Sequence, residues 1–145
     1  MNYIRVKKLK DAAILPTYGT QESAGADLYA CLESDVEIKP GCSAFIPTGL
    51  AMEIPSGFAG LIYARSGMAC KRDLAPANKV GVIDSDYRGE FIVVLHNHGL
   101  QPQTVKHGER IAQLLITPVL APAFEMVDDL SSTERAAGGF GSTGK

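Results

Sequence analysis

Short apolar or alternating segments, each closed by Gly or Pro, recur along this chain and constrain its fold more than any other feature. The first of them alternates, as a half-buried strand does, through Ala24, Ala26, Leu28 and Ala30. Further runs of this kind span residues 36–38, 44–46, 50–54, 58–63, 80–83, 91–95, 111–116 and 124–127. We expect Pro47 to end one strand before the next begins. This spacing predicts an all-β sandwich, barrel or jelly roll, with one short helix after Arg65.

Size and charge exclude several classes of protein. The 145 residues suit one domain, and a formal net charge of −2 argues against a partner as anionic as nucleic acid. The apolar runs are too short to span a membrane, and the N-terminus has no signal-peptide pattern. Cys31, Cys42 and Cys70 make an odd count without C-x-x-C spacing, so we expect a reduced protein of the cytoplasm.

The last fifteen residues differ from the rest in composition. From Ser131 onward the sequence is rich in Gly and Ala and has no apolar period. We therefore expect a β domain over residues 1–130 and a flexible glycine-rich arm over residues 131–145. The arm is either a lid that orders over a ligand or a frayed terminus. Its G-x-x-x-x-G-K pattern at 139–145 is not a P-loop, because no helix can follow Lys145 in this sequence.

Two segments combine a strand end with polar side chains. The run 80–83 leads into Asp84 and Asp86, where a desolvated carboxylate would suit a general base, although Asp also favours ordinary turns. The run 58–63 leads into Arg65-Ser66-Gly67 at the start of the expected helix. Free N–H groups beside an Arg would bind phosphate; a salt-bridged Arg beside a Ser N-cap is the alternative.

The histidines offer a further possibility. His96 and His98 are two apart on an expected strand and so share a face, and with His107 they would make a zinc site. No Cys or carboxylate at ligand spacing accompanies them, which favours ordinary solvent-facing histidines. No Ser lies in a G-x-S-x-G elbow, so the sequence offers no support for covalent catalysis.

Five segments, taken in order, resemble the five motifs of the trimeric deoxyuridine triphosphatase (dUTPase) family. They are Ser23-Ala24-Gly25-Ala26-Asp27-Leu28, Ala64-Arg65-Ser66-Gly67, residues 81–89, Gly108-Glu109-Arg110-Ile111-Ala112-Gln113, and Arg135 with Gly138-Gly139-Phe140-Gly141-Ser142. The resemblance implies a jelly-roll homotrimer with active sites between subunits. It also implies hydrolysis of dUTP to dUMP and pyrophosphate, which keeps uracil out of DNA and supplies dUMP for thymidylate synthesis.

The same resemblance implies a role for each motif residue. Asp84 would activate the attacking water, and Tyr87 would press on the deoxyribose where a 2′-hydroxyl would sit. Mg²⁺ would be held by the substrate phosphates and water, with Asp27 reaching only its water ligands. The phosphate contacts implied are Arg65, Ser66, Gly67 and Gln113. The uracil contacts implied are Asn78, Gly81, Val82, Ile83 and Ile92. The arm contacts implied are Arg135, Phe140, Gly141, Ser142 and Thr143.

Two other functions are alternatives to the hydrolysis of dUTP that the resemblance implies. A dCTP deaminase resembles the family in fold and ligand, but would need a catalytic Glu and a different hairpin from the one at 84–89. A non-catalytic nucleotide-binding or protein-interaction trimer is the second alternative. The presence of Asp84 and of the whole arm argues against it.

Overall fold

The computed structural model describes residues 3–139, which hold eleven strands and one short helix. The strands are β1 (Arg5–Lys8), β2 (Thr17–Tyr18), β3 (Ala26–Tyr29), β4 (Val36–Ile38), β5 (Ser43–Glu53), β6 (Phe58–Tyr63), β7 (Leu74–Pro76), β8 (Gly81–Ile83), β9 (Glu90–Asn97), β10 (Gln103–Val105) and β11 (Arg110–Pro118). The helix is α1 (Ser66–Arg72). No helix in the described part has the length and apolar character needed to cross a membrane. The expected all-β class with one short helix is confirmed.

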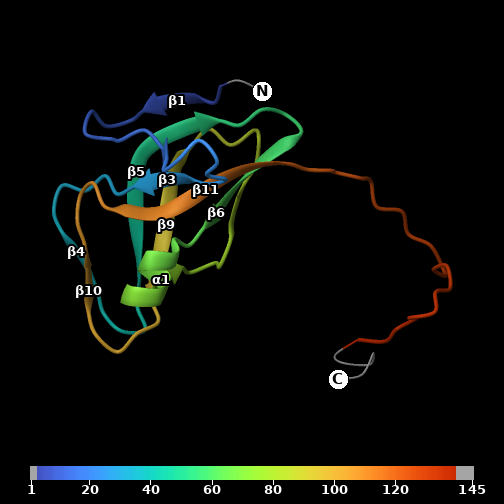
Figure 1. Cartoon of the computed structure of the whole chain (residues 1–145). Coiled ribbons are helices and arrows are strands. Elements are labelled where there is room, and N and C mark those ends of the chain that lie inside the picture. Colours follow the sequence, from blue (N-terminus) through green and yellow to red (C-terminus); the bar gives the residue numbers. More distant parts are fainter. Residues whose placement is uncertain (1–2, 140–145) are drawn as a thin grey trace.

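The strands form two main antiparallel sheets that pack face to face. One has the order β1-β5-β9-β7 and the other β2-β3-β11-β6-β8, while β10 and β4 form a separate ribbon. In Figure 1, β3 and β11 cross in front of β5 and β9, so the two sheets are the layers of a jelly-roll-like sandwich. Leu28 and Ile111 from one sheet and Phe91 and Ile46 from the other are fully buried in the shared core.

Alternation along the strands explains which residues enter this core. Phe91, Val93 and Leu95 on β9 are buried, whereas Ile92 between them is exposed. Each fully buried side chain of this size contributes roughly 1.5–3 kcal/mol. The predicted inward face of residues 24–30 is confirmed for Ala26, Leu28 and Ala30.

The predicted break at Pro47 is wrong, because β5 runs without interruption through this residue. Its pairing with β9 shifts register between Pro47 and Ala51, and Gly49 has a φ of +69°. A glycine in the left-handed region is what a β-bulge needs. Glu90 Oε1 accepts a hydrogen bond from Gly49 N at 2.7 Å, which fixes the bulge to β9. The proline therefore lies at an irregularity inside a strand and does not end the strand.

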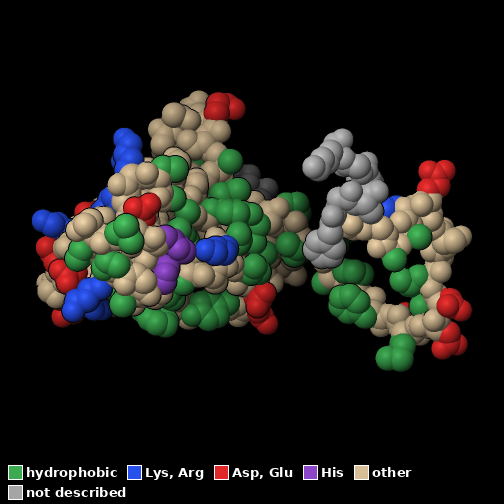
Figure 2. Space-filling model, turned by 90° about the horizontal axis from the view of Figure 1, so that it is seen from below, with side chains coloured by type: hydrophobic (Ala, Val, Ile, Leu, Met, Phe, Trp, Pro, Cys, Tyr) green, Lys and Arg blue, Asp and Glu red, His purple; other side chains and the backbone are tan. Residues whose placement is uncertain are grey.

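The predicted strand at 124–127 does not form in the single chain. After Pro118 the described chain has no helix or strand, and Figure 1 shows it leaving the β body. Phe124 and Met126 are 100% and 99% exposed, and Figure 2 shows hydrophobic side chains spread along the segment. A strand needs a neighbouring strand to satisfy its backbone, and no strand of the described chain lies alongside. Four short strands were not predicted: β1, β2, β7 and β10.

Candidate active site

Strand register brings together the polar residues of three sequence segments. In the β11 ladder, Gln113 lies opposite Asp27 of β3 on one side and opposite Tyr63 of β6 on the other. Gln113 Nε2 donates to Ala64 O at 2.8 Å, which ties β11 to the residue before Arg65. Gly25 makes room for this amide, because a Cβ there would lie 2.6 Å from Gln113 Oε1.

Arg65 is the residue from which α1 starts. Its backbone is extended, with φ −85° and ψ 135°, and its carbonyl accepts from Ala69 N at 3.0 Å. Arg65 is therefore the N-cap, and it makes no side-chain capping bond. The alternative with Ser66 as N-cap is wrong, because Ser66 is already helical. The salt bridge of Arg65, which was the other part of that alternative, is present.

Asp27 is the partner of that salt bridge and also holds a second arginine. Arg65 Nε donates to Asp27 Oδ1 at 2.6 Å, and Arg110 Nη1 donates to Oδ2 at 3.3 Å. The Asp27 side chain is only 14% exposed, so one partly buried carboxylate is matched by two guanidinium groups. This excess of positive charge suits an anionic ligand.

Arg65 and Arg110 border an open pocket of about 460 Å³. Arg72 also lines it, but Arg72 Nη1 is paired with Glu109 Oε2 at 3.0 Å and Nη2 donates to Thr104 O at 2.5 Å. Arg65 and Arg110 therefore supply the available charge. The full lining is Tyr29, Arg65, Gly67, Met68, Arg72, Gly108, Glu109 and Arg110. We call this the Arg65 pocket.

A second group of predicted residues lines the opening between β8 and β9. Two adjoining cavities of about 260 and 100 Å³ share Val82, Ile83, Ile92 and Val94. Asp84 and Tyr87 line the larger cavity, whereas Asn78 and Gly81 line the smaller. We call the two cavities together the hairpin pocket. The structure thus groups the six residues predicted for the base and sugar with the predicted general base.

The turn that follows β8 fixes the orientation of Tyr87. Its backbone N donates to Asp84 O at 3.2 Å, and its hydroxyl donates to Glu90 O at 3.0 Å. A Cβ on Gly89 would collide with the Tyr87 hydroxyl, so only glycine leaves space for the ring. The ring centroid is 6.2 Å from that of Phe91. Tyr87 is therefore held as a wall of the pocket while the residue stays 43% exposed.

Arg88 stabilises the same turn from outside. Its Nη1 donates to Ser85 O at 2.7 Å and to Tyr87 O at 3.0 Å, and Nη2 lies 3.5 Å from Glu53 Oε1. Glu53 also pairs with Arg5 of β1. This network joins the turn to β5.

Asp84 directly follows β8 and is exposed, so the prediction that the end of a buried strand would partly desolvate it is wrong for the single chain. The reason is that Val82 on β8 is 63% exposed, because β8 is an edge strand with little cover. In the single chain the carboxylate lies at the rim of the hairpin pocket.

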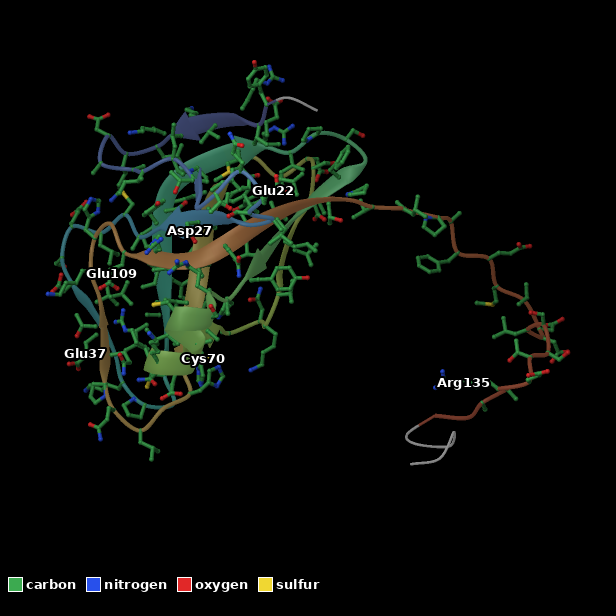
Figure 3. The ribbon with its side chains drawn as sticks, in the orientation of Figure 1. Glu22, Asp27, Glu37, Cys70, Glu109 and Arg135 are labelled. Carbon is green, nitrogen blue, oxygen red and sulfur yellow. The ribbon has the colours of Figure 1, made fainter. Side chains whose placement is uncertain are left out.

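The Arg65 pocket and the hairpin pocket have no lining residue in common. Arg135 lies apart from both. Figure 3 shows it on the segment that leaves the body, while Asp27 lies within the body, and Arg135 Nε donates to Gly138 O at 2.9 Å. Phe140, Gly141, Ser142 and Thr143 lie outside the described residues. One chain thus presents the predicted site in separate parts.

Sequence reasoning missed several residues of these pockets. Arg110 lies in a quoted motif, but a register shift between Arg110 and Ala112 prevents its direction from being read by alternation. Glu90 and Phe45 line the hairpin pocket, and no sequence signal connects β5 with that hairpin.

The side chains available as ligands limit the ways in which a divalent ion could bind here. Within residues 3–139, no three His, Cys, Asp or Glu side chains gather in a metal-binding arrangement. Both Asp27 oxygens already accept from arginines, which leaves their remaining lone pairs for a water ligand of the ion. Mg²⁺ prefers phosphate and water oxygens, so an ion carried by a triphosphate fits this site.

Comparison with known proteins agrees with this geometry. The family model dUTPase matches residues 11–144. The deoxyuridine 5′-triphosphate nucleotidohydrolase of Desulfitobacterium hafniense is 50% identical over 99% of both chains, and that of Syntrophotalea carbinolica is 46% identical over 97% of this chain and 96% of its own.

Solved structures show the same likeness. The Staphylococcus bacteriophage 80alpha dUTPase with dUPNHPP superposes with a TM-score of 0.89, at 30% identity, and covers 100% of both chains. A mutant dUTPase of phage phi11 of S. aureus, described with a structural Mg(II) ion, gives a TM-score of 0.80 at 25% identity, over 88% of this chain and 98% of its own.

Proposed function

The chain belongs to the dUTPase family and is a dUTP diphosphatase, and we propose that Asp84 is its general base. The observation that carries this assignment is that Asp84 and Tyr87 line one cavity of about 260 Å³. A base must lie within hydrogen-bond reach of the water that it activates, and a substrate in this cavity would extend past Asp84.

In the proposed reaction, Asp84 takes a proton from a water molecule whose oxygen attacks the α-phosphorus. The bond from that phosphorus to the oxygen that bridges the α- and β-phosphates breaks, this oxygen leaves with pyrophosphate, and dUMP is the other product. The base and sugar lie in the hairpin pocket, where Asn78, Gly81, Val82, Ile83 and Ile92 surround uracil. Tyr87, held by the Glu90 carbonyl, occupies the space that a 2′-hydroxyl would need.

The phosphates bind at the Arg65 pocket, away from the hairpin pocket. Arg65, Ser66 and Gly67 at the start of α1 contact phosphate oxygens together with Gln113, whose amide is tied to Ala64 O beside them. Asp27 orients the Arg65 guanidinium, because its Oδ1 accepts from Nε and leaves the terminal nitrogens free to donate. Mg²⁺ bound to the phosphates would neutralise their charge and hold the triphosphate in position for in-line attack.

We further propose that the active form is a homotrimer with sites between subunits. Two observations support assembly: the two pockets share no lining residue, and Phe124 and Met126 are almost fully exposed on an extended segment. Exposed apolar side chains in series mark contact surfaces. In the assembly the arm, residues 131–145, would close over a site, with Arg135 on the γ-phosphate, Phe140 on uracil, and Gly141, Ser142 and Thr143 near the phosphates.

In the cell, such an enzyme would keep uracil out of DNA and supply dUMP for thymidylate synthesis, and we place it in the cytoplasm. One assay tests the activity against its competitors. The chain is incubated with dUTP or dCTP and Mg²⁺, and pyrophosphate and ammonia are measured. We expect pyrophosphate from dUTP and no ammonia. Ammonia from dCTP would indicate a deaminase, and no product from either would indicate a binding module.

A further inference from the structure

Two histidines with no role in the proposed reaction lie against each other at the end of β9. The ring centroids of His96 and His98 are 4.5 Å apart, with the planes at 63°. His98 is exposed and His96 is half-buried. Neither lines the Arg65 pocket or the hairpin pocket. Figure 2 shows histidine side chains together on the surface, beside a basic side chain and hydrophobic ones.

A residue of β5 holds one ring nitrogen of His96. Ser43 lies opposite His96 in the ladder, and Ser43 Oγ is 2.8 Å from His96 Nδ1. In the tautomer in which Nδ1–H donates a hydrogen bond to Ser43 Oγ, the Nε2 lone pair is available to a metal ion. A hydrogen bond to the other ring nitrogen is the usual way in which proteins orient a metal-binding imidazole.

The third histidine is not part of this pair. His107 Nδ1 accepts from Leu32 N at 3.2 Å, in the loop before β11. The three-histidine zinc site considered from the sequence is therefore wrong, but the two-histidine part of it is formed. The pKa of His98 is lowered, first by desolvation of its ring and then by the charges of Lys79 and His96, while Asp73 acts in the opposite direction.

We propose that His96 and His98 chelate one divalent transition-metal ion of the zinc or nickel type. Imidazole nitrogens suit these ions, whereas Mg²⁺ prefers oxygen ligands. Water completes the coordination sphere, since residues 3–139 bring no third His, Cys, Asp or Glu to the pair. The site is distinct from the Mg²⁺ that accompanies dUTP.

The test is NMR of the histidine ring protons in the untagged chain, which contains three histidines. Zn²⁺ is titrated in the presence of millimolar Mg²⁺, without nucleotide. We expect the His96 and His98 signals to shift together and to saturate, while the His107 signal stays in place. Mg²⁺ alone moves none of them.

Variants then identify the ligands by calorimetry with Zn²⁺. His96→Gln and His98→Gln each abolish the saturable binding, and the matched control His107→Gln keeps it. Ser43→Ala weakens binding about tenfold, because the ring loses its orientation. Signals that do not move up to millimolar Zn²⁺, an equal shift of His107, or unchanged affinity in His96→Gln would each overturn the proposal.

Discussion

Arg65 Nε lies 2.6 Å from Asp27 Oδ1, so a residue at the start of the helix is fixed by a strand that comes far earlier in the chain. The pair is partly buried, with side chains 25% and 14% exposed. Asp27 therefore orients the Arg65 guanidinium, which in the proposed reaction binds phosphate.

The first prediction concerns this pair. Asp27→Asn keeps the shape of the side chain but removes the charge that holds Arg65 and Arg110. We expect the KM for dUTP to rise about tenfold, equivalent to about 1.4 kcal/mol, with a smaller effect on kcat. Steady-state kinetics measures both. The control is Asp35→Asn, whose exposed ion pair with Lys106 spans 3.8 Å and should be neutral. An unchanged KM in Asp27→Asn would mean that the ion pair between Asp27 and Arg65 has only a structural role.

The second prediction concerns the turn between Asp84 and Tyr87. Arg88→Gln removes two hydrogen bonds to the turn carbonyls, each worth roughly 0.5–1.5 kcal/mol. We expect kcat for dUTP to fall about tenfold and the melting temperature to fall by a few degrees at most, because both hydrogen bonds are exposed. Arg5→Gln is the matched control, because Arg5 shares Glu53 with Arg88 but does not touch the turn. Equal losses in both variants would mean that the Glu53 network, and not the turn, matters.

The third prediction concerns sugar specificity. Tyr87→Ala removes the ring that Gly89 and the Glu90 carbonyl hold in place. The vacated space admits a 2′-hydroxyl, so the ratio of kcat/KM for UTP to that for dUTP should rise by roughly 10- to 200-fold. Competition assays with both nucleotides measure this ratio. If it does not change, Tyr87 only packs against Phe91.

The fourth prediction concerns the arm. Deletion of residues 131–145 should leave the melting temperature and the oligomeric state unchanged, because no residue of the described part of the arm belongs to the core. Turnover of dUTP should fall by orders of magnitude. In the full chain, a non-hydrolysable dUTP analogue with Mg²⁺ should protect the arm from protease better than dUMP does. Full activity of the truncated protein would mean that the arm does not act as a lid.

The fold was predictable wherever burial alone decides the structure. The runs at 58–63 and 111–116 correspond to β6 and to the middle of β11, because both lie in the interior of a sheet. The sequence predicted two strands where the structure has the single strand β5, because a bulge at Gly49 lets Pro47 lie inside a strand. Short edge strands such as β2 carry too few buried residues to leave a periodic signal.

The sequence predicted a set of candidate site residues but not their arrangement in space. Motif resemblance named Arg65, Gln113 and Asp27, and the β11 register brings them together. The resemblance assigned no role to Arg110, because the direction of this side chain depends on a register shift in β11. It also did not predict that Asp84 lies at the open rim of the hairpin pocket, because this depends on what covers the edge strand β8. Contacts made across an assembly leave no pattern in one sequence.

Turnover of dUTP by Asp84→Asn tests whether Asp84 is the base. Asparagine keeps the shape of the side chain but cannot accept the proton of the water. Pyrophosphate release with Mg²⁺ should fall about 10²–10⁴-fold, while calorimetry with a non-hydrolysable analogue gives a Kd close to that of the unmodified chain. Asp86→Asn, in the same turn, should keep most of the activity. Near-normal turnover by Asp84→Asn, with the loss found in Asp86→Asn instead, would contradict the account.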